Sequence, residues 1–523
     1  MFRTAHRSIP LALALCAGCA DDPDGPGISA SGTSTGTTGS SGPDPTTAGD
    51  PTSEPTSTGP TSGGATESAG DTTTADTTTT ADTSGDTTAA TSGDTTAGVD
   101  TETDTDTTGG PVEPPKSCKA GELPYAGSLC GGDNPPCELR LDEPVDAKSA
   151  FRNDAPGLAL GQDCQPHVVY SVAEEGYHGF YARRAPGGVW TTDPTPMPIA
   201  TVGLVIDPAD GVPRAVVDDG AFTAELHRYS DDAWSLEASI LGQTLVQARG
   251  VALDDLGNIL LAALDEPDDL KLGVYADGWQ FMPLAGKSHA PAVAASPVPE
   301  RAHVVAWSSQ GGNWSAVWHA PPDGPETITS YGSNALERDA LAIAVAPSQD
   351  DAVPDVPHVL LAQLREGGGH QIVLAYRDEP GPWDVEVVAE ETPEVDIFCD
   401  QDPKEDGETC DYSFTEVRPL AAVASRGGDV RFFWARVTFA GTLVSECVVK
   451  PNLLCTWKPQ VEEVGGELFV GWRTPEGPQS ALVHKDIVPR SATAAIDSTG
   501  EMHLAVYDQS DANSTVRYLR VGE

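Results

Sequence analysis

The sequence predicts an all-β protein, a β-propeller preceded by a long segment that cannot fold. From residue 157 onward, short apolar or alternating runs are separated by turns of Gly, Pro, Asp and Asn, and no long stretch has a 3.6-residue period. A unit of about 44 residues recurs through this part of the chain, and this length is typical of a four-stranded propeller blade. Residues 20–115, by contrast, contain no aromatic residue.

Each copy of the repeat begins with a short strand rich in Ala, turns at Asp or Ser, and continues through longer strands. Small residues are expected in the first strand because the innermost strands of a propeller crowd around its channel. Trp190, Trp234 and Trp279 are spaced by 44 and 45 residues, and we expect their rings to fill the wider gaps between blades. The first strands of the seven copies start at Leu158, Gly203, Val251, Ala292, Ala342, Ala421 and Ala494.

Seven blades are therefore predicted. Six or eight are alternatives, because the sequence does not place the strands between Val464 and Val488. A pair of β-sandwiches is the competing architecture, and the regular Trp spacing disfavours it.

Closure of the ring needs a strand from outside the last copy. That copy stops at Glu523 one strand short, and Glu138–Leu141, ahead of the first copy, can supply the missing strand. The sequence therefore predicts an N-terminal clasp in residues 116–156 and the propeller in residues 157–523, with only short strand edges left open.

Residues 20–115 are predicted to form a disordered linker. They consist mainly of Thr, Ser, Gly, Asp and Pro, and ordering each residue costs about 1–2 kcal/mol of backbone entropy that no apolar burial offsets. The segment carries 17 acidic residues and neither Lys nor Arg, so its charges repel one another. We expect an extended tether of roughly 50–60 Å or more that acts as a spacer.

The first 19 residues are typical of an export signal. Arg3 and Arg7 precede a short apolar run, and Ala17 and Gly18 are the small residues that a signal peptidase needs before Cys19. The run is too short to span a bilayer, which takes about 20 residues. Such a signal followed by an Asp/Thr-rich stalk resembles bacterial surface lipoproteins, and the resemblance implies a lipid on Cys19 and a place on the outer-membrane surface. Secretion without a lipid is the alternative.

Eight cysteines follow the signal, and an even number in an oxidising compartment predicts disulfides. Their spacing predicts the local pairs Cys399–Cys410 and Cys447–Cys455. A zinc site is the rival explanation for the other four, but no CxxC pair occurs. These four can pair in three ways, and they are Cys118, Cys130, Cys137 and Cys164.

The formal net charge is −49. A field this negative repels polyanions, and nucleic acid is excluded as a partner because its phosphates need clustered Lys and Arg. The acidic surface suits an exported protein, and solubility alone also explains it. We expect a monomer whose partners are the membrane, through its lipid, and a glycan or an extracellular protein.

Several cationic side chains are expected at one mouth of the channel, because equivalent positions of a propeller lie at equal heights. His289, Arg418 and Arg490 each stand seven residues before the turn that ends an inner strand. Arg249 and Arg338 precede two other inner strands at nearby offsets. Arg binds carboxylate and sulfate groups well, so these residues form a predicted anion site. The alternative is that each Arg pairs with an acid of the next blade and clasps the ring.

The longest insertion, Glu390–Val417, is expected to lie as a loop between two blades. Its carboxylates could hold Ca²⁺, which favours six to eight oxygen ligands, although the EF-hand spacing is absent and a solvated acidic loop explains the same residues. No other cofactor is predicted, since the histidines show no metal-ligand spacing. The carboxylates in question are Asp396, Asp400, Asp402 and Asp406.

The turn Asp497–Gly500 and the strand Glu501–Tyr507 look similar to those of sialidase-like and related bacterial propellers. For a sialidase the resemblance implies an arginine cluster that binds a substrate carboxylate, here Arg249, Arg418 and Arg490. Glycoside cleavage needs two carboxylates about 5–9.5 Å apart, and spacing nominates no such pair. The sequence leaves enzymatic activity open. It favours a non-catalytic module that binds a glycan or a protein, with a sialidase-like enzyme acting on acidic glycans as the alternative.

Overall fold

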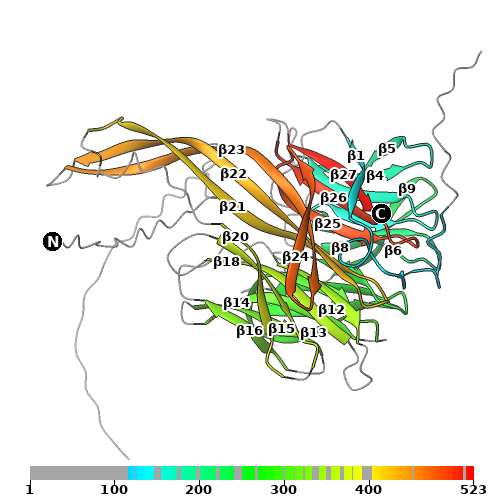
Figure 1. Cartoon of the computed structure of the whole chain (residues 1–523). Helices are drawn as coiled ribbons and strands as arrows, with labels where there is room; N and C mark the ends of the chain where they lie inside the picture. Colours follow the sequence, from blue (N-terminus) through cyan, green and yellow to red (C-terminus); the bar gives the residue numbers. More distant parts are fainter. Residues whose placement is uncertain are drawn as a thin grey trace, which may run out of the picture. The chain divides into compact units, whose positions relative to one another are not determined.

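The computed structural model is built from β-strands throughout its described residues (Figure 1). Within this part of the chain no helix is long and apolar enough to cross a membrane. The predicted signal, the linker and Cys19 lie outside the described residues. The structure describes residues 116–523 except 124, 147–154, 173–177, 196–200, 219–223, 241–249, 266–268, 299–300, 311–312, 322–323, 332–340, 349–354, 365–369, 380, 392–402, 404, 450–452 and 511–513.

The described strands form seven antiparallel blades of four strands each. Blade one contains β2 (Gly157–Leu160), β3 (Pro166–Val172), β4 (His178–Arg184) and β5 (Trp190–Pro194). Blade two contains β6 (Thr201–Ile206), β7 (Pro213–Asp218), β8 (Ala224–Ser230) and β9 (Ala233–Ile240). Blade three contains β10 (Val251–Leu253), β11 (Ile259–Asp265), β12 (Asp269–Tyr275) and the first half of β13 (Trp279–Ala295).

The second half of β13 is the innermost strand of blade four, so this long strand joins two blades into one sheet. Blade four continues with β14 (Ala302–Gln310), β15 (Asn313–His319) and β16 (Glu326–Tyr331). Blade five contains β17 (Leu341–Pro347), β18 (Asp355–Leu364), β19 (His370–Tyr376) and β20 (Asp384–Glu391). Blade six contains β21 (Thr409–Ala424), β22 (Val430–Val449), β23 (Leu453–Thr474) and β24 (Gly477–Lys485). Blade seven contains β25 (Pro489–Ile496), β26 (Met502–Asp508), β27 (Thr515–Gly522) and β1 (Glu138–Pro144).

The innermost strands close a ring. Each contacts the inner strands of both neighbouring blades, in the order β2, β6, β10, β13, β17, β21, β25 and back to β2. The seven first strands predicted from the repeat all fall on these elements. The structure is therefore a seven-bladed β-propeller, as predicted, and the pair of β-sandwiches is excluded.

The predicted clasp strand is confirmed. β1 pairs with β27 in antiparallel register, with Leu139 opposite Val521, and supplies the outer strand of blade seven. Two disulfides lie in the same N-terminal part of the described chain, which settles the pairing that the sequence left open. They are Cys118–Cys164 and Cys130–Cys137.

Of the two predicted local disulfides, one is confirmed and the other involves a residue outside the described part of the chain. Cys447–Cys455 is present and joins directly opposed residues of β22 and β23. Cys410 is disulfide-bonded, but Cys399, its predicted partner, lies outside the described residues.

Residues 116–131, here called the N-terminal segment, cross one face of the ring. This face carries the turns between the first and second strands of the blades, and we call it the turn face. The amide of Cys118 donates to the carbonyl of Gln162 in blade one at 2.8 Å. The amide of Ala120 donates to the carbonyl of Pro208 in blade two at 3.3 Å. The segment is thus fixed to successive turns.

The far end of the N-terminal segment is held by blade six. The amide of Arg426 donates to the carbonyl of Tyr125 at 2.6 Å. The buried guanidinium of Arg431 donates to the carbonyls of Cys130, at 2.6 Å, and Leu129, at 2.9 Å. Backbone carbonyls of the segment therefore supply most of the acceptors of this buried cation, and the carbonyl of Val430 supplies another.

The predicted role of the outer tryptophans is confirmed. Trp279 packs against an apolar cluster built from blades two and three, and the other two tryptophans meet aromatic rings of the preceding blade. The Trp190 ring packs edge-on against Tyr518 of blade seven, with centroids 5.5 Å apart. The Trp234 ring packs edge-on against Tyr181 of blade one at 5.2 Å. Each of these two indoles begins or nearly begins an outer strand and meets an aromatic ring on the third strand of the preceding blade, where a propeller is widest.

Blade six departs from the regular pattern. β21, β22 and β23 are 16, 20 and 22 residues long, whereas β24 pairs only with the last part of β23, from Glu467 on. The surplus forms a three-stranded extension, here called the arm, which Figure 1 shows as long ribbons leaving the blade. The arm consists of residues 409–417, 437–449 and 453–466.

The prediction that Glu390–Val417 forms a loop is wrong at both ends. Glu390 and Glu391 end β20, and residues 409–417 are the first part of β21, paired with β22 from Thr409 opposite Val444 onward. Their strand partner begins some twenty residues later in the chain, beyond the blade turn, so the pairing was not visible in local spacing.

Candidate functional site

The central channel opens into a cavity of about 570 Å³ on the turn face. Its walls are the ends of the inner strands, with mostly small apolar side chains, and the turns that follow them. Ala120 and Leu123 also line it, so the N-terminal segment fills part of this mouth. The Arg426 guanidinium of blade six pairs with Asp255 of blade three at 2.6 Å. This mouth is therefore narrowed by the chain itself.

The predicted anion-site residues lie toward the other ends of the inner strands. The cavity lining begins four residues beyond each of His289, Arg418 and Arg490, which is about 13 Å along an extended strand. His289 packs against the Trp314 ring, with centroids 5.0 Å apart. The remaining two residues of the predicted set, Arg249 and Arg338, lie outside the described residues.

Arg418 and Arg490 meet at one carboxylate. Arg418 donates to Glu463 and to Glu416, each at 2.9 Å. Arg490 lies 3.6 Å from the same oxygen of Glu463. Arg490 belongs to blade seven and Glu463 to blade six, so this carboxylate joins two blades. The contacts favour the interblade clasp, and anion binding by these residues stays a prediction.

Replacing Arg418 by Met should lower the free energy of unfolding by about 3–5 kcal/mol, because it leaves the buried carboxylate of Glu416 without its guanidinium partner. Arg490→Met is the matched control. Its side chain is 36% exposed, and we expect a loss below about 1 kcal/mol. Urea unfolding of both variants measures the difference. Equal, small losses would show that the buried Arg418–Glu416 pair stabilises the protein no more than an exposed contact does.

Of the four predicted calcium ligands, the structure describes only Asp406. The Asp406 carboxylate accepts a hydrogen bond from the amide of Cys447 at 2.9 Å, which fixes the turn before β21 to the end of the arm. Calcium binding stays a prediction. The other three carboxylates lie outside the described residues, and they are Asp396, Asp400 and Asp402.

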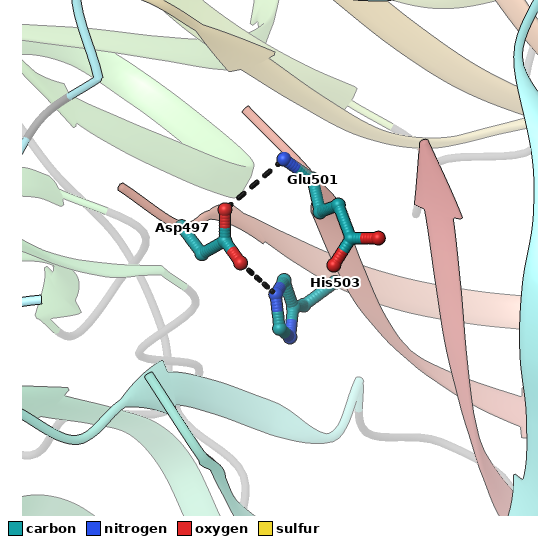
Figure 2. A group of neighbouring side chains, drawn as sticks. All are labelled: Asp497, Glu501 and His503. Carbon is teal, nitrogen blue, oxygen red and sulfur yellow. Dashed lines mark hydrogen bonds and ion pairs between the residues drawn. The ribbon is translucent and has the colours of Figure 1, made fainter. Parts of the chain in front are cut away.

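A compact group of ligand-type side chains lies in blade seven on the turn face. Figure 2 shows Asp497, Glu501 and His503 pointing toward one another, and one ligand atom of each lies within 4.8 Å of the others. Asp497 follows β25, and the other two flank the start of β26. Residues two apart along a strand share a face, so Glu501 and His503 lie together, and the turn brings Asp497 back to them.

The two oxygens of Asp497 have different partners. Oδ1 accepts from the amides of Thr499, at 2.8 Å, and Glu501, at 3.1 Å, which holds the turn in shape. Oδ2 lies 3.3 Å from Nε2 of His503 and 2.9 Å from Nζ of Lys116. Only Oδ2 therefore faces the centre of the group.

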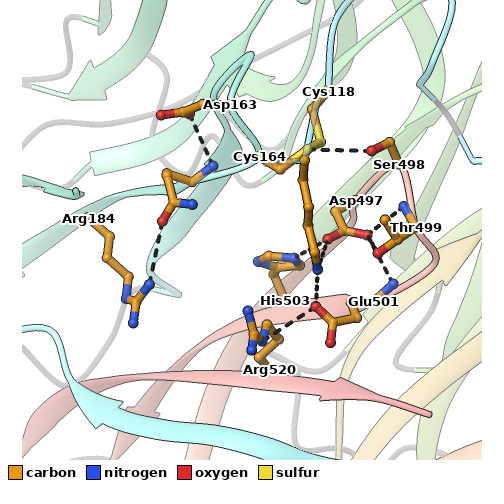
Figure 3. A network of polar contacts seen from close by, with 12 residues as sticks. Cys118, Asp163, Cys164, Arg184, Asp497, Ser498, Thr499, Glu501, His503 and Arg520 are labelled. Carbon is orange, nitrogen blue, oxygen red and sulfur yellow. Dashed lines mark hydrogen bonds and ion pairs between the residues drawn. A yellow bond between two sulfur atoms is a disulfide. The ribbon is translucent and has the colours of Figure 1, made fainter. Parts of the chain in front are cut away.

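Lys116 supplies a cation to this group. Its ammonium pairs with Asp497 and Glu501, and Nε of Arg520 lies 3.4 Å from Glu501 Oε2; Figure 3 shows the surrounding network. Burial alone would raise the pKa of Asp497, but the interactions with His503 and Lys116 outweigh it and hold the pKa far below its usual range. The carboxylate is therefore ionised at neutral pH.

The histidine of the group follows an arrangement found elsewhere in the ring. Nδ1 of His503 lies 2.6 Å from the Tyr518 hydroxyl on the third strand of its blade. In blade four, Nδ1 of His303 accepts from the Trp318 indole at 3.0 Å, and Nε2 lies 2.8 Å from Asp355. A histidine tied to an aromatic residue is thus part of the blade architecture. The second carboxylate and the ammonium distinguish blade seven from blade four.

Sequence spacing did not nominate this group. The available signal was a carboxylate in a turn, closed by Gly500 at φ +88°, followed by two ligand-type residues on one face of a strand. Lys116 could not be found in this way, because 381 residues separate it from Asp497.

No protein-family model matches the chain, and no curated protein matches it. Solved structures with similar chain paths include AofleA from Arthrobotrys oligospora, with 11% identity and a TM-score of 0.36 over 68% of this chain and 97% of that one. The SapL1 lectin in complex with alpha methyl fucoside has 12% identity and a TM-score of 0.34 over 58% and 99%. The RRP9 WD40 repeats have 10% identity and a TM-score of 0.40 over 75% and 99%. Similarities this remote carry no argument about what this chain binds.

Proposed function

We propose that the protein is an exported, lipid-anchored, non-catalytic binding module that recognises a glycan or another extracellular protein. The arm of blade six is the observation that carries this proposal. It projects from the face of the ring opposite the turn face, to which the N-terminal segment is fixed. A module held at one face with a stiff projection on the other is suited to present a binding surface.

The direction of the arm follows from strand register. β21 ends at Ala424 beside a turn on the turn face, and β22 begins just after that turn at Val430. The arm is built from the other ends of these strands, beyond Val417 on β21 and beyond Arg436 on β22. The N-terminal segment contacts the turns. The chain therefore enters the propeller on one face, and the arm leaves on the other.

The arm has the features of a stiff element. The rings of Phe414 and Phe439 stack across β21 and β22 with centroids 4.5 Å apart, and both side chains are buried. The Cys447–Cys455 disulfide links β22 and β23 two residues from their hairpin connection. A cross-link of this kind limits fraying at the end of a long hairpin.

The other face of the arm exposes aliphatic side chains beside carboxylates. Val448 and Val464 are 51% and 58% exposed. Val448 shares its strand face with the exposed residue Glu446, because side chains alternate along a strand, and the exposed residue Glu462 lies two residues before Val464. Val448 lies near the free end of the arm, opposite Leu454, and Val464 lies near its base, beside Gly465, so exposed aliphatic side chains flanked by carboxylates occur at both ends of the arm.

Val448→Asp combined with Val464→Asp should lower binding at least tenfold on a glycan array and on an array of purified envelope proteins, with thermal unfolding unchanged. Charge at these positions adds a desolvation cost to any contact there. Val189→Asp is the matched control, since this side chain is 64% exposed in a different blade.

The same samples distinguish the alternative function. If the wild type releases sialic acid from a sialylated polymer, the protein is a sialidase-like enzyme and the proposal of a non-catalytic binding module is wrong. Unchanged binding by the double variant would show that the arm is not part of the recognition surface.

A further inference from the structure

We propose that Asp497, Glu501 and His503 form a divalent-cation site of the kind that binds zinc. In the absence of metal, the Lys116 ammonium occupies the position of the cation. Metal binding and attachment of the N-terminal segment through Lys116 then exclude each other. The proposal concerns the turn face and does not depend on the arm or its partner.

The ligand chemistry suits zinc or a similar first-row metal. The three side chains offer two carboxylate oxygens and one imidazole nitrogen, and a site with three protein ligands leaves a further position for water. The three ligand atoms lie within 4.8 Å of one another. Bond lengths of about 2.0–2.2 Å need ligand atoms roughly 3–4 Å apart, so a small side-chain adjustment closes the site.

His503 is already oriented for ligation. Its side chain is 3% exposed, and the contact between Nδ1 and the Tyr518 hydroxyl turns Nε2 toward the carboxylates. Histidines that bind metals typically have their other ring nitrogen fixed by such a partner. Nε2 is buried and lies 3.3 Å from Oδ2 of Asp497 without a well-aligned hydrogen bond. It can therefore bind a metal without giving up such a bond.

Lys116 takes the place that a metal would occupy. Its ammonium contacts Oδ2 of Asp497 and Oε2 of Glu501, the same oxygens that face the centre of the group. The Cys118–Cys164 disulfide fixes the chain two residues later, so Lys116 can swing out without detaching the rest of the N-terminal segment. A cavity of about 310 Å³ beside Lys116 gives it room.

Blade four offers an internal comparison. There, Asp355 accepts from the hydroxyl of Ser296 at 2.5 Å and contacts His303 at 2.8 Å, so one carboxylate serves the histidine. The described residues contain no other group of three such ligands within the same distance. The second carboxylate of blade seven is what converts a structural contact into a cation site.

The full chain with Lys116→Met should bind Zn²⁺ at least tenfold more tightly than the wild type in isothermal titration calorimetry at pH 7, because no ammonium competes. Lys119→Met, an exposed neighbour in the same segment, is the matched control and should bind as the wild type does. Adding His503→Gln to Lys116→Met should remove the gain. Equal zinc affinity of the wild type and Lys116→Met, with both folded, overturns the proposal.

A second measurement uses the unchanged protein. Zn²⁺ should accelerate acylation of the Lys116 amine relative to Lys119, read by mass spectrometry, because displacement exposes the amine. Labelling of Lys116 that does not respond to millimolar Zn²⁺ also overturns the proposal. This test holds even where Lys116→Met fails to fold.

Discussion

A chain that begins at residue 146 is expected to lose cooperative folding, whereas a chain that begins at residue 116 should unfold at the same temperature as the full protein. The shorter chain lacks β1, so β27 keeps an unpaired edge in the outer position of blade seven. Leu519 and Val521, fully buried in the closed ring, then lose part of their cover.

The same truncation removes the partners of Arg431. Its side chain is 5% exposed, and without the carbonyls of Leu129 and Cys130 a buried cation loses its main acceptors, which costs about 3–5 kcal/mol. The truncation also removes Leu129 and Val145, whose side chains are buried. Burial of each contributes about 1.5–3 kcal/mol to the free energy of unfolding. These losses together approach the whole stability of a typical domain, about 5–15 kcal/mol.

Calorimetry and circular dichroism of the two truncated chains test this expectation, and the chain from residue 116 is the control. Arg431→Met in the full chain isolates the contribution of the guanidinium. A chain from residue 146 that melts like the full protein would show that the ring closes without its clasp.

Acidification from pH 6.5 toward pH 4 should destabilise the protein steeply. Burial lowers the pKa of His167, His319 and His358 to about 4, against about 6.5 in the unfolded chain. Within this range the unfolded chain binds up to three protons that the folded protein does not. The free energy of unfolding therefore falls as the pH falls, by up to about 4 kcal/mol per pH unit from these three histidines. Their contribution levels off below pH 4, whereas carboxylates with a lowered pKa, such as Asp497, extend the loss to lower pH.

Urea unfolding at several pH values between 7 and 5 measures this slope. His358→Gln should reduce it by roughly a quarter to a third, because one of these protons no longer takes part and burial also lowers the pKa of His370. His178→Gln is the control, since that side chain is exposed. A free energy of unfolding that does not change between pH 6.5 and pH 5 would contradict the expectation.

One histidine acts in the opposite direction. The contact of His484 with Asp142 of the clasp strand, at 2.7 Å, raises the pKa of the histidine. Its contribution to stability is complete below the unfolded pKa of about 6.5 and is lost as the pH rises through the raised value. It therefore affects the neutral range and does not offset the acid loss.

The sequence alone determined the propeller, its seven inner strands and its clasp. Each blade is a run of consecutive strands joined by short turns, so Ala-rich strands such as Ala342–Val345 and the outer tryptophans repeat at readable intervals. The Cys447–Cys455 pair was equally readable, because its two residues face each other across one hairpin.

Only the tertiary structure decided the arm, the Cys118–Cys164 pairing and the contacts of Lys116. Closure of the ring places residue 116 beside residue 497, and no local period encodes such a meeting. Arg418 shows the same limit, since its place on an inner strand was readable but its neutralisation by Glu463 was not. Strand periodicity reports which face a side chain occupies, whereas its charge partners depend on which blades the closed ring brings together.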